Sequence, residues 1–242
     1  MRVEVLFGEV ANLFGDMQNV AYLRQTLPDA EFIETAFADR PFFADNDPDL
    51  LYMGAMTESA QRRAIETLSP YKERLRALID KGCVMLFTGN AGEVLFDRIS
   101  YVTEEIETDG LGLVPLTART DLFDRYNGKV LGALFADPEA DAVGPVTGFR
   151  SQFSRWHGDN EKNAFLTVRR GMGLNEGSRL EGWREKNLIC TNVIGPILPL
   201  NPKLTEHLLA LAGAPVPAAH RLSALKAWEQ RVIEMEDPAT RF

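Results

Sequence analysis

Cysteine and histidine are scarce in this chain of 242 residues, which has two cysteines and three histidines. Cys83 and Cys190 are too few for a disulfide framework. Both lie in apolar runs, which is typical of buried thiols in a cytoplasmic protein. His157, His207 and His220 are far apart in the sequence. With no cysteine and histidine cluster at ligand spacing, we expect no metal site, and nothing indicates a cofactor.

Positive charge and long apolar runs are also lacking. The chain has 26 Lys and Arg against 35 Asp and Glu, a formal net charge of −9. This balance argues against nonspecific binding to nucleic acid or anionic membranes, although a specific basic partner is compatible with it. No run approaches the roughly 18 apolar residues of a membrane span. Glu4 interrupts the apolar start of the chain, so we expect no signal peptide and a cytoplasmic location.

The first half of the chain alternates short apolar runs with segments of helical periodicity, typical of a parallel α/β sheet. Five consecutive apolar residues at 83–87 indicate a central strand buried on both faces. A glycine and asparagine turn follows, and we expect a helix to begin near Glu93. The other predicted strands are residues 2–7, 31–37 and 49–53, and the predicted helices are 16–27 and 58–81, the second broken near Ser69-Pro70 and ended by Gly82.

The second half, from about residue 101 to 195, is richer in short β-like runs. Two helices are predicted to close the chain. We find no internal repeat and no clear linker, so the sequence favours one domain over residues 1–242. The predicted strands here are residues 129–135, 164–168 and 187–193, and the predicted helices are 202–212 and 223–236.

Five segments carry a distinctive pattern of glycine, asparagine and proline. They read NLFGDMQN at 12–19, YMGAMTESAQ at 52–61, GFRSQ at 148–152, GMGLN at 171–175 followed by Glu181-Gly182, and TNVIGPILPLNP at 191–202. In this order they resemble five segments of the cobyric-acid-synthase-like class I glutamine amidotransferases (CobB/CobQ type). The resemblance covers roughly residues 1–212, which leaves 213–242 as a helical extension. The chain is most similar to the amidotransferase subunits of lipid II isoglutaminyl synthase.

This resemblance implies a class I amidotransferase-like (flavodoxin-like) α/β fold, with a mainly parallel sheet flanked by helices. In the family, a cysteine at a strand-to-helix elbow attacks the side-chain amide of glutamine, and a nearby histidine keeps it a thiolate. Backbone N–H groups stabilise the oxyanion. The ammonia passes to a synthetase partner, here expected to be Mur-ligase-like and to bind ATP.

The chain departs from the family pattern where catalysis depends on it. Thr88 stands at the position of the cysteine, Ile194 at that of the histidine, and Gln152 at that of a second histidine. A hydroxyl needs a base that Ile194 cannot supply. A β-branched residue also fits poorly in a strained elbow, so we predict a relaxed turn at Thr88 and an apolar cavity floor. We therefore expect no glutaminase activity.

Five residues remain candidates for binding a ligand. Arg125 resembles an arginine that holds the glutamine α-carboxylate in the family; the alternative is an ion pair with a neighbouring aspartate. Gly54-Ala55 and Gly89-Asn90 would present backbone N–H groups to an anion, or serve only as turns.

Three functions stay open at this point. The first is a non-catalytic or regulatory subunit of the synthetase, which could retain glutamine or a small carboxylate in the old pocket. The second is an active amidotransferase with a rewired site, using Thr88 with His157 or with a nearby acid. The third is a free-standing module that binds a small carboxylate through Arg125.

Overall fold

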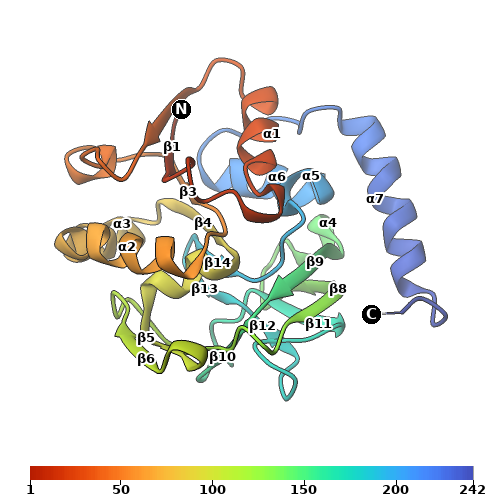
Figure 1. The fold of residues 1–242 in the computed structure, drawn as a ribbon. Helices are drawn as coiled ribbons and strands as arrows, with labels where there is room; N and C mark the ends of the chain where they lie inside the picture. Colours follow the sequence, from red (N-terminus) through yellow and green to blue (C-terminus); the bar gives the residue numbers. More distant parts are fainter. Residues whose placement is uncertain (242) are drawn as a thin grey trace.

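The computed structural model describes residues 1–241, and a six-stranded sheet lies at its centre (Figure 1). The strand order is β13-β14-β4-β3-β1-β2. Five of these strands are parallel, and β13 alone runs antiparallel at one edge. The predicted α/β class with a mainly parallel sheet is confirmed. The strands are β1 (Arg2–Leu6), β2 (Glu31–Thr35), β3 (Leu50–Met53), β4 (Val84–Thr88), β13 (Trp183–Glu185) and β14 (Leu188–Thr191).

Helices cover both faces of this sheet because its central strands are apolar on both sides. In β4, Val84 and Leu86 belong to one buried cluster and Met85 and Phe87 to the other, as the alternation of a strand requires. The first cluster includes residues of α1 and α6, and the second includes residues of α2 and α3. These helices are α1 (Gln18–Thr26), α2 (Glu58–Leu68), α3 (Lys72–Lys81) and α6 (Pro202–Leu211), with a short α5 (Ile197–Leu200) before α6.

Two predicted helix signals are confirmed. The break near Ser69-Pro70 is a 3₁₀ turn, η3 (Ser69–Tyr71), between α2 and α3. Gly82 ends α3 with φ of 81°, in the left-handed region that glycine adopts without strain.

The helix predicted near Glu93 is wrong. The chain forms a 3₁₀ segment, η4 (Gly89–Leu95), and passes directly into β5 (Phe96–Tyr101). Glu93, Val94, Leu95 and Phe96 are all at most 1% exposed. A surface helix needs a solvated face, which four consecutive buried residues do not leave.

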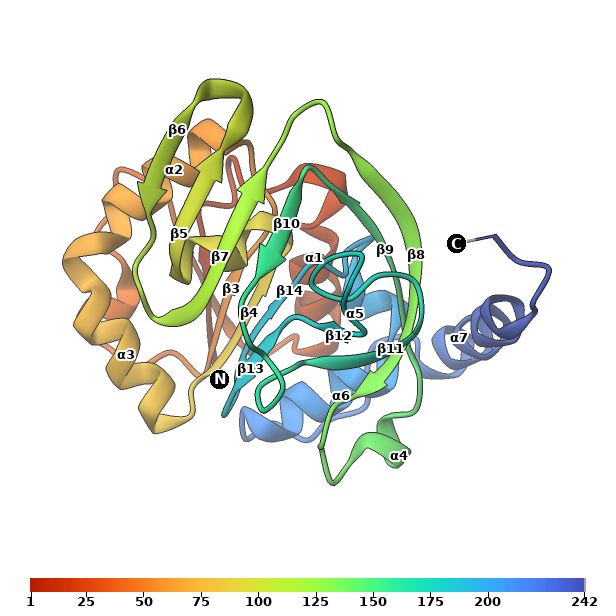
Figure 2. The same ribbon diagram turned by 90° about the horizontal axis from the view of Figure 1, so that it is seen from below.

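The second half of the chain forms two further four-stranded sheets (Figure 2). Their strand orders are β10-β7-β5-β6 and β12-β11-β8-β9. The sequence predicted strands in this region but not their division into two sheets. Their bounds are β6 (Ile106–Asp109), β7 (Val114–Thr120), β8 (Tyr126–Leu134), β9 (Val146–Gln152), β10 (Ser154–His157), β11 (Leu166–Arg170) and β12 (Leu180–Glu181); a short α4 (Ala140–Val143) and η1 (Leu13–Gly15), η2 (Phe42–Ala44) and η5 (Val102–Glu104) complete the connections.

The C-terminal extension is the helix α7 (Arg221–Glu236). Trp228 anchors it, because the indole packs against Gly144 and its Nε1 donates to the carbonyl oxygen of Pro145 at 2.9 Å. Within residues 1–241, no helix has the length and apolar character needed to cross a membrane.

Candidate functional site

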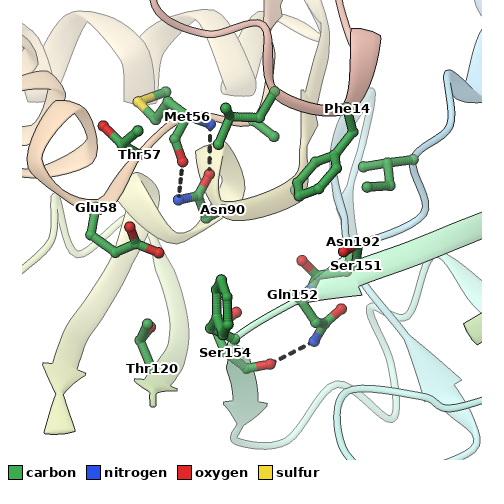
Figure 3. A pocket seen from close by; sticks show the side chains of 15 residues that line it. Phe14, Met56, Thr57, Glu58, Asn90, Thr120, Ser151, Gln152, Ser154 and Asn192 are labelled. Atoms are coloured by element: carbon green, nitrogen blue, oxygen red, sulfur yellow. Dashed lines mark hydrogen bonds between the residues drawn. The ribbon is translucent and has the colours of Figure 1, made fainter. Parts of the chain in front are cut away.

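A cavity of about 260 Å³ lies where the loops after β3, β4 and β14 meet (Figure 3). These loops follow the carboxyl ends of parallel strands, the usual place for a ligand site in an open α/β sheet. The strands β7, β9 and β10 close the opposite wall. The cavity is lined by Leu13, Phe14, Ala55, Met56, Thr57, Glu58, Gly89, Asn90, Thr120, Ser151, Gln152, Phe153, Ser154, Asn192 and Ile194.

Thr88 ends β4 beneath this cavity and does not line it. Its backbone has φ of −107° and ψ of 147°, ordinary extended values, so the predicted relaxed turn is confirmed. The residue is 0% exposed, and its hydroxyl donates to Asp16 Oδ2 at 2.6 Å. The left-handed residue is Gly89, with φ of 59°. A Cβ on Gly89 would lie 2.7 Å from that of Ala55, so glycine is required there.

The hydroxyl of Thr88 belongs to a buried polar network. The Tyr52 hydroxyl lies 3.2 Å from Thr88 Oγ1 and donates to the Asp16 carbonyl oxygen. Asn19 donates to Tyr52 at 3.0 Å and accepts from the Leu198 N–H at 2.9 Å. Burial raises the pKa of Asp16, and its hydrogen bonds from Thr88, Ala55 and Asn19 partly offset that rise. The network ties the η1 loop, β3, β4 and α5 together, a structural role.

Two loop N–H groups beside the cavity, those of Ala55 and Met56, are bound by side chains of the protein. Asp16 Oδ2 accepts from the Ala55 N–H at 2.9 Å. The Asn90 side chain accepts from the Met56 N–H at 2.9 Å and donates to the Met56 carbonyl oxygen at 2.8 Å. Gly54 is needed for close packing, because a Cβ there would lie 2.4 Å from the Ala11 carbonyl oxygen. The bond to the Ala55 N–H favours the turn interpretation of Gly54-Ala55, while anion binding by the N–H groups of Gly89-Asn90 stays a prediction.

Ile194 and Gln152 both line the cavity. Two backbone hydrogen bonds join Ile194 to Phe149, because the N–H of each residue donates to the carbonyl oxygen of the other. The Gln152 amide accepts from Arg150 Nε at 2.8 Å and donates to the Ser154 carbonyl oxygen at 2.6 Å. No histidine or cysteine is among the described lining residues. A base placed as in the family is therefore not found at this wall.

Arg125 does not itself line the cavity and is exposed to solvent. Its guanidinium donates to Ser151 Oγ at 2.6 and 3.1 Å. It also lies over the rings of Phe14 and Phe153, at 5.8 and 5.3 Å from their centroids. Ser151, Phe14 and Phe153 all line the cavity, so the positive charge is near its mouth.

The alternative of an ion pair for Arg125 is not found. Asp121 pairs with Arg119 at 3.6 Å, and Asp124 pairs with Arg155 at 3.4 Å. Among the residues described, no carboxylate lies within salt-bridge distance of Arg125. Its predicted role in holding a carboxylate stays a prediction.

The remaining candidates lie away from the cavity. Cys83 lies just before β4, at the opposite end from Thr88, and burial raises the pKa of its thiol to about 12. Cys190 is completely buried in β14, and burial raises the pKa of its thiol as well. His157 is exposed at the end of β10, with no hydrogen bond to Thr88. Within residues 1–241, no group of histidine, cysteine and carboxylate side chains is arranged to hold a metal.

Two comparisons now bear on this geometry. The sequence is 28% identical over 206 residues to subunit GatD of the glutamine-hydrolyzing lipid II isoglutaminyl synthase of Staphylococcus aureus, which covers 83% of this chain and 79% of that subunit. This chain is a glutamine amidotransferase-like protein related to GatD. A scan against family models found no match.

Solved structures show the same fold. PurLQS from Thermotoga maritima matches with a TM-score of 0.56 and 11% identity, over 96% of this chain and 98% of that one. A solved glutamine amidotransferase matches with a TM-score of 0.55 and 14% identity, over 87% of this chain and 98% of that one. At these identities the likeness concerns the fold, and the amidotransferase-like architecture predicted from the motifs is confirmed.

Several cavity residues were not singled out from the sequence. Glu58, Thr120, Phe153 and Asn192 line the cavity, and two of them lie inside recognised motifs. Asn192 lies two residues before Ile194 in the segment 191–202, and that position could have marked it. Thr120 and Phe153 come from β7 and the β9–β10 turn, and only the pairing of distant strands brings them to the site.

Proposed function

We propose that this protein is a non-catalytic or regulatory subunit of a Mur-ligase-like amidating synthetase, in the cytoplasm, and not a glutaminase. The observation that carries the proposal is the state of Thr88. Its hydroxyl is fully buried, bound to Asp16 and absent from the cavity surface. A nucleophile has to reach its substrate within about 3.5 Å in an aligned geometry.

The cavity walls support the same conclusion. Ile194 offers no proton acceptor, and the N–H groups of Ala55 and Met56 already have partners. Loss of a nucleophile or its base typically lowers the rate by several orders of magnitude.

A partner surface is supported by exposed apolar side chains in the segments that carry the cavity wall. Phe123 is 90% exposed, and Leu13, Phe14, Leu122 and Phe149 are each about two fifths exposed. Contiguous exposed apolar side chains are typical of protein interfaces. GatD is a subunit of a synthase. Because this chain is related in sequence to GatD, we propose an ATP-binding synthetase as its partner.

The test is ammonia release from glutamine by the purified protein, alone and with a candidate Mur-ligase-like synthetase from the same organism. We expect no turnover above background in either case. The positive control is the double variant Thr88→Cys, Ile194→His, which restores the cysteine and histidine of the family at these two positions. Turnover by the natural protein that disappears in Thr88→Ala would overturn the proposal.

One observation favours a second candidate, an amidotransferase with a rewired site. Thr88 donates to a carboxylate, the arrangement that a hydroxyl nucleophile and its base would need. The pair is buried away from the cavity, so activity would require the η1 loop to move. In that case Asp16→Asn would abolish turnover while the fold is kept.

A further inference from the structure

Two oppositely charged side chains flank the cavity, and neither has a counter-ion among the described residues. Among the described residues, Arg125 makes its polar contacts with Ser151 and lies over the rings of Phe14 and Phe153. Glu58 begins α2 and lines the cavity half-buried, with no hydrogen bond or ion pair to another described residue. Asp121 and Asp124, which are close to Arg125 in the sequence, form ion pairs with Arg119 and Arg155 instead. Two charges without a counter-ion among the described residues, Arg125 and Glu58, thus lie at or next to the cavity.

These charges lie toward different sides of the cavity. Ser151, which binds Arg125, lies near Asn192 on one side in Figure 3, whereas Glu58 and Thr120 lie on the other. The antiparallel bridge between Phe149 and Ile194 agrees with this placement. Partners in an antiparallel pair run in opposite directions, so Ser151, two residues after Phe149, lies opposite Asn192, two residues before Ile194. Each side thus combines one charged and one neutral polar side chain.

The neutral polar residues have spare hydrogen-bonding capacity. Asn192 is 2% exposed and Thr120 is 4% exposed. Asn192 Nδ2 and Thr120 Oγ1 have no hydrogen-bond partner among the described residues. A buried polar atom without a partner is unfavourable and uncommon in native proteins. Rotation about the last side-chain torsion would turn either group toward the cavity, since both residues line it.

Much of the remaining lining is apolar and comes from Leu13, Ala55, Met56, Phe153 and Ile194. The side chains of Asn90, Gln152 and Ser154 also line the cavity, but they are already hydrogen-bonded within the protein. An amide in this part of the cavity would meet Ile194 and the already engaged N–H groups of Ala55 and Met56. A hydrocarbon chain has no hydrogen bonds to lose there, and removing its apolar surface from water is favourable.

We propose that the cavity binds a small dipolar molecule whose anionic and cationic groups are joined by a short apolar chain. The anion lies toward Arg125 and Asn192, and the cation toward Glu58 and Thr120. A volume of about 260 Å³ is slightly below the range of roughly 300 to 1,000 Å³ typical of ligand pockets, so the ligand is small. The inference rests on the proposed function, because it assigns the cavity to a ligand other than the glutamine of a hydrolytic site.

Calorimetric titration of the full chain tests this. The probes are γ-aminobutyrate and ε-aminocaproate, with caproate, hexylamine and L-glutamine for comparison. We expect one of the two dipolar probes to bind at least about tenfold more tightly than caproate, hexylamine and glutamine, since each charged hydrogen bond contributes roughly tenfold or more.

Two variants separate the two ends. Arg125→Gln should weaken the dipolar probe and caproate about tenfold and leave hexylamine unchanged, and Glu58→Gln should weaken the dipolar probe and hexylamine and leave caproate unchanged. Arg24→Gln and Glu34→Gln, an exposed pair outside the cavity, are the matched controls and should change nothing.

The crossed pattern would support the proposal, and three results would overturn it. They are tighter binding of glutamine than of either dipolar probe, no binding of any probe, and equal losses for all probes in both variants. The glutaminase assay is a separate readout. If the protein hydrolyses glutamine and does not bind the dipolar probes, both proposals are wrong. If it does not hydrolyse glutamine and does not bind the probes, only the proposal of a dipolar ligand is wrong.

Discussion

The polar groups beneath the cavity and those at its walls are arranged in opposite ways. Below, Asp16, Asn19, Tyr52 and Thr88 satisfy one another and are sealed from solvent. At and next to the walls, Glu58 and Arg125 have no counter-ion within residues 1–241, and Asn192 and Thr120 carry unpaired polar atoms. The first group has the properties of a structural network, and the second those of a binding surface. The position expected to hold a nucleophile has become part of the structural network.

The largest effect should come from breaking that network. Asp16→Ala removes the acceptor for Thr88, the Ala55 N–H and Asn19 together, and each stranded group costs about 1–3 kcal/mol. Because the costs are not additive, we expect a loss of about 3–5 kcal/mol in the free energy of unfolding, measured with urea. The exposed Asp29→Ala is the control and should change it by less than about 0.5 kcal/mol. A loss below about 1 kcal/mol for Asp16→Ala would contradict the structural role.

A substitution among the exposed apolar side chains near the cavity, here called the rim (Leu13, Phe14, Leu122, Phe123 and Phe149), should weaken binding of the synthetase partner without changing the stability of the protein. Phe123→Ser removes an aromatic ring that is 90% exposed, so the free energy of unfolding should change by less than about 0.5 kcal/mol. We expect affinity for the synthetase partner to fall about tenfold or more, measured by titration of the complex. Leu222→Ser on α7, where the side chain is 78% exposed, is the matched control. Equal loss of affinity in both variants would contradict a rim-centred interface.

The pH dependence of stability gives a smaller effect. Burial raises the pKa of Asp16 in the folded protein, so the folded state holds this proton more tightly than the unfolded state. The stabilising contribution is fully present below the unfolded pKa of about 4 and is lost as pH rises through the folded value. Relative to Asp16→Asn, the natural protein should therefore lose stability as pH increases from about 4. Urea titrations at several pH values measure this, and a difference that stays constant or changes in the opposite sense would count against the assignment.

Local signals predicted the parallel sheet well, but not the contacts that define the site. The apolar run of β4 and the left-handed Gly82 depend on near neighbours, which sequence patterns report. The bond between Thr88 and Asp16 joins residues 72 positions apart, and that of Arg125 with Ser151 joins residues 26 apart. Such pairs are set by strand order and loop packing. The resemblance supplied the position of Thr88, while its inward hydroxyl became visible only in the fold.

Covalent labelling tests the central claim most directly. The purified protein is incubated with an electrophilic glutamine analogue, alone and with its synthetase partner, and adducts are located by peptide mass spectrometry. A buried Thr88 hydroxyl bound to Asp16 predicts no adduct at Thr88, while the Thr88→Cys, Ile194→His variant, if it folds, provides the positive control. An adduct on Thr88 of the natural protein would show a reactive nucleophile and contradict the account.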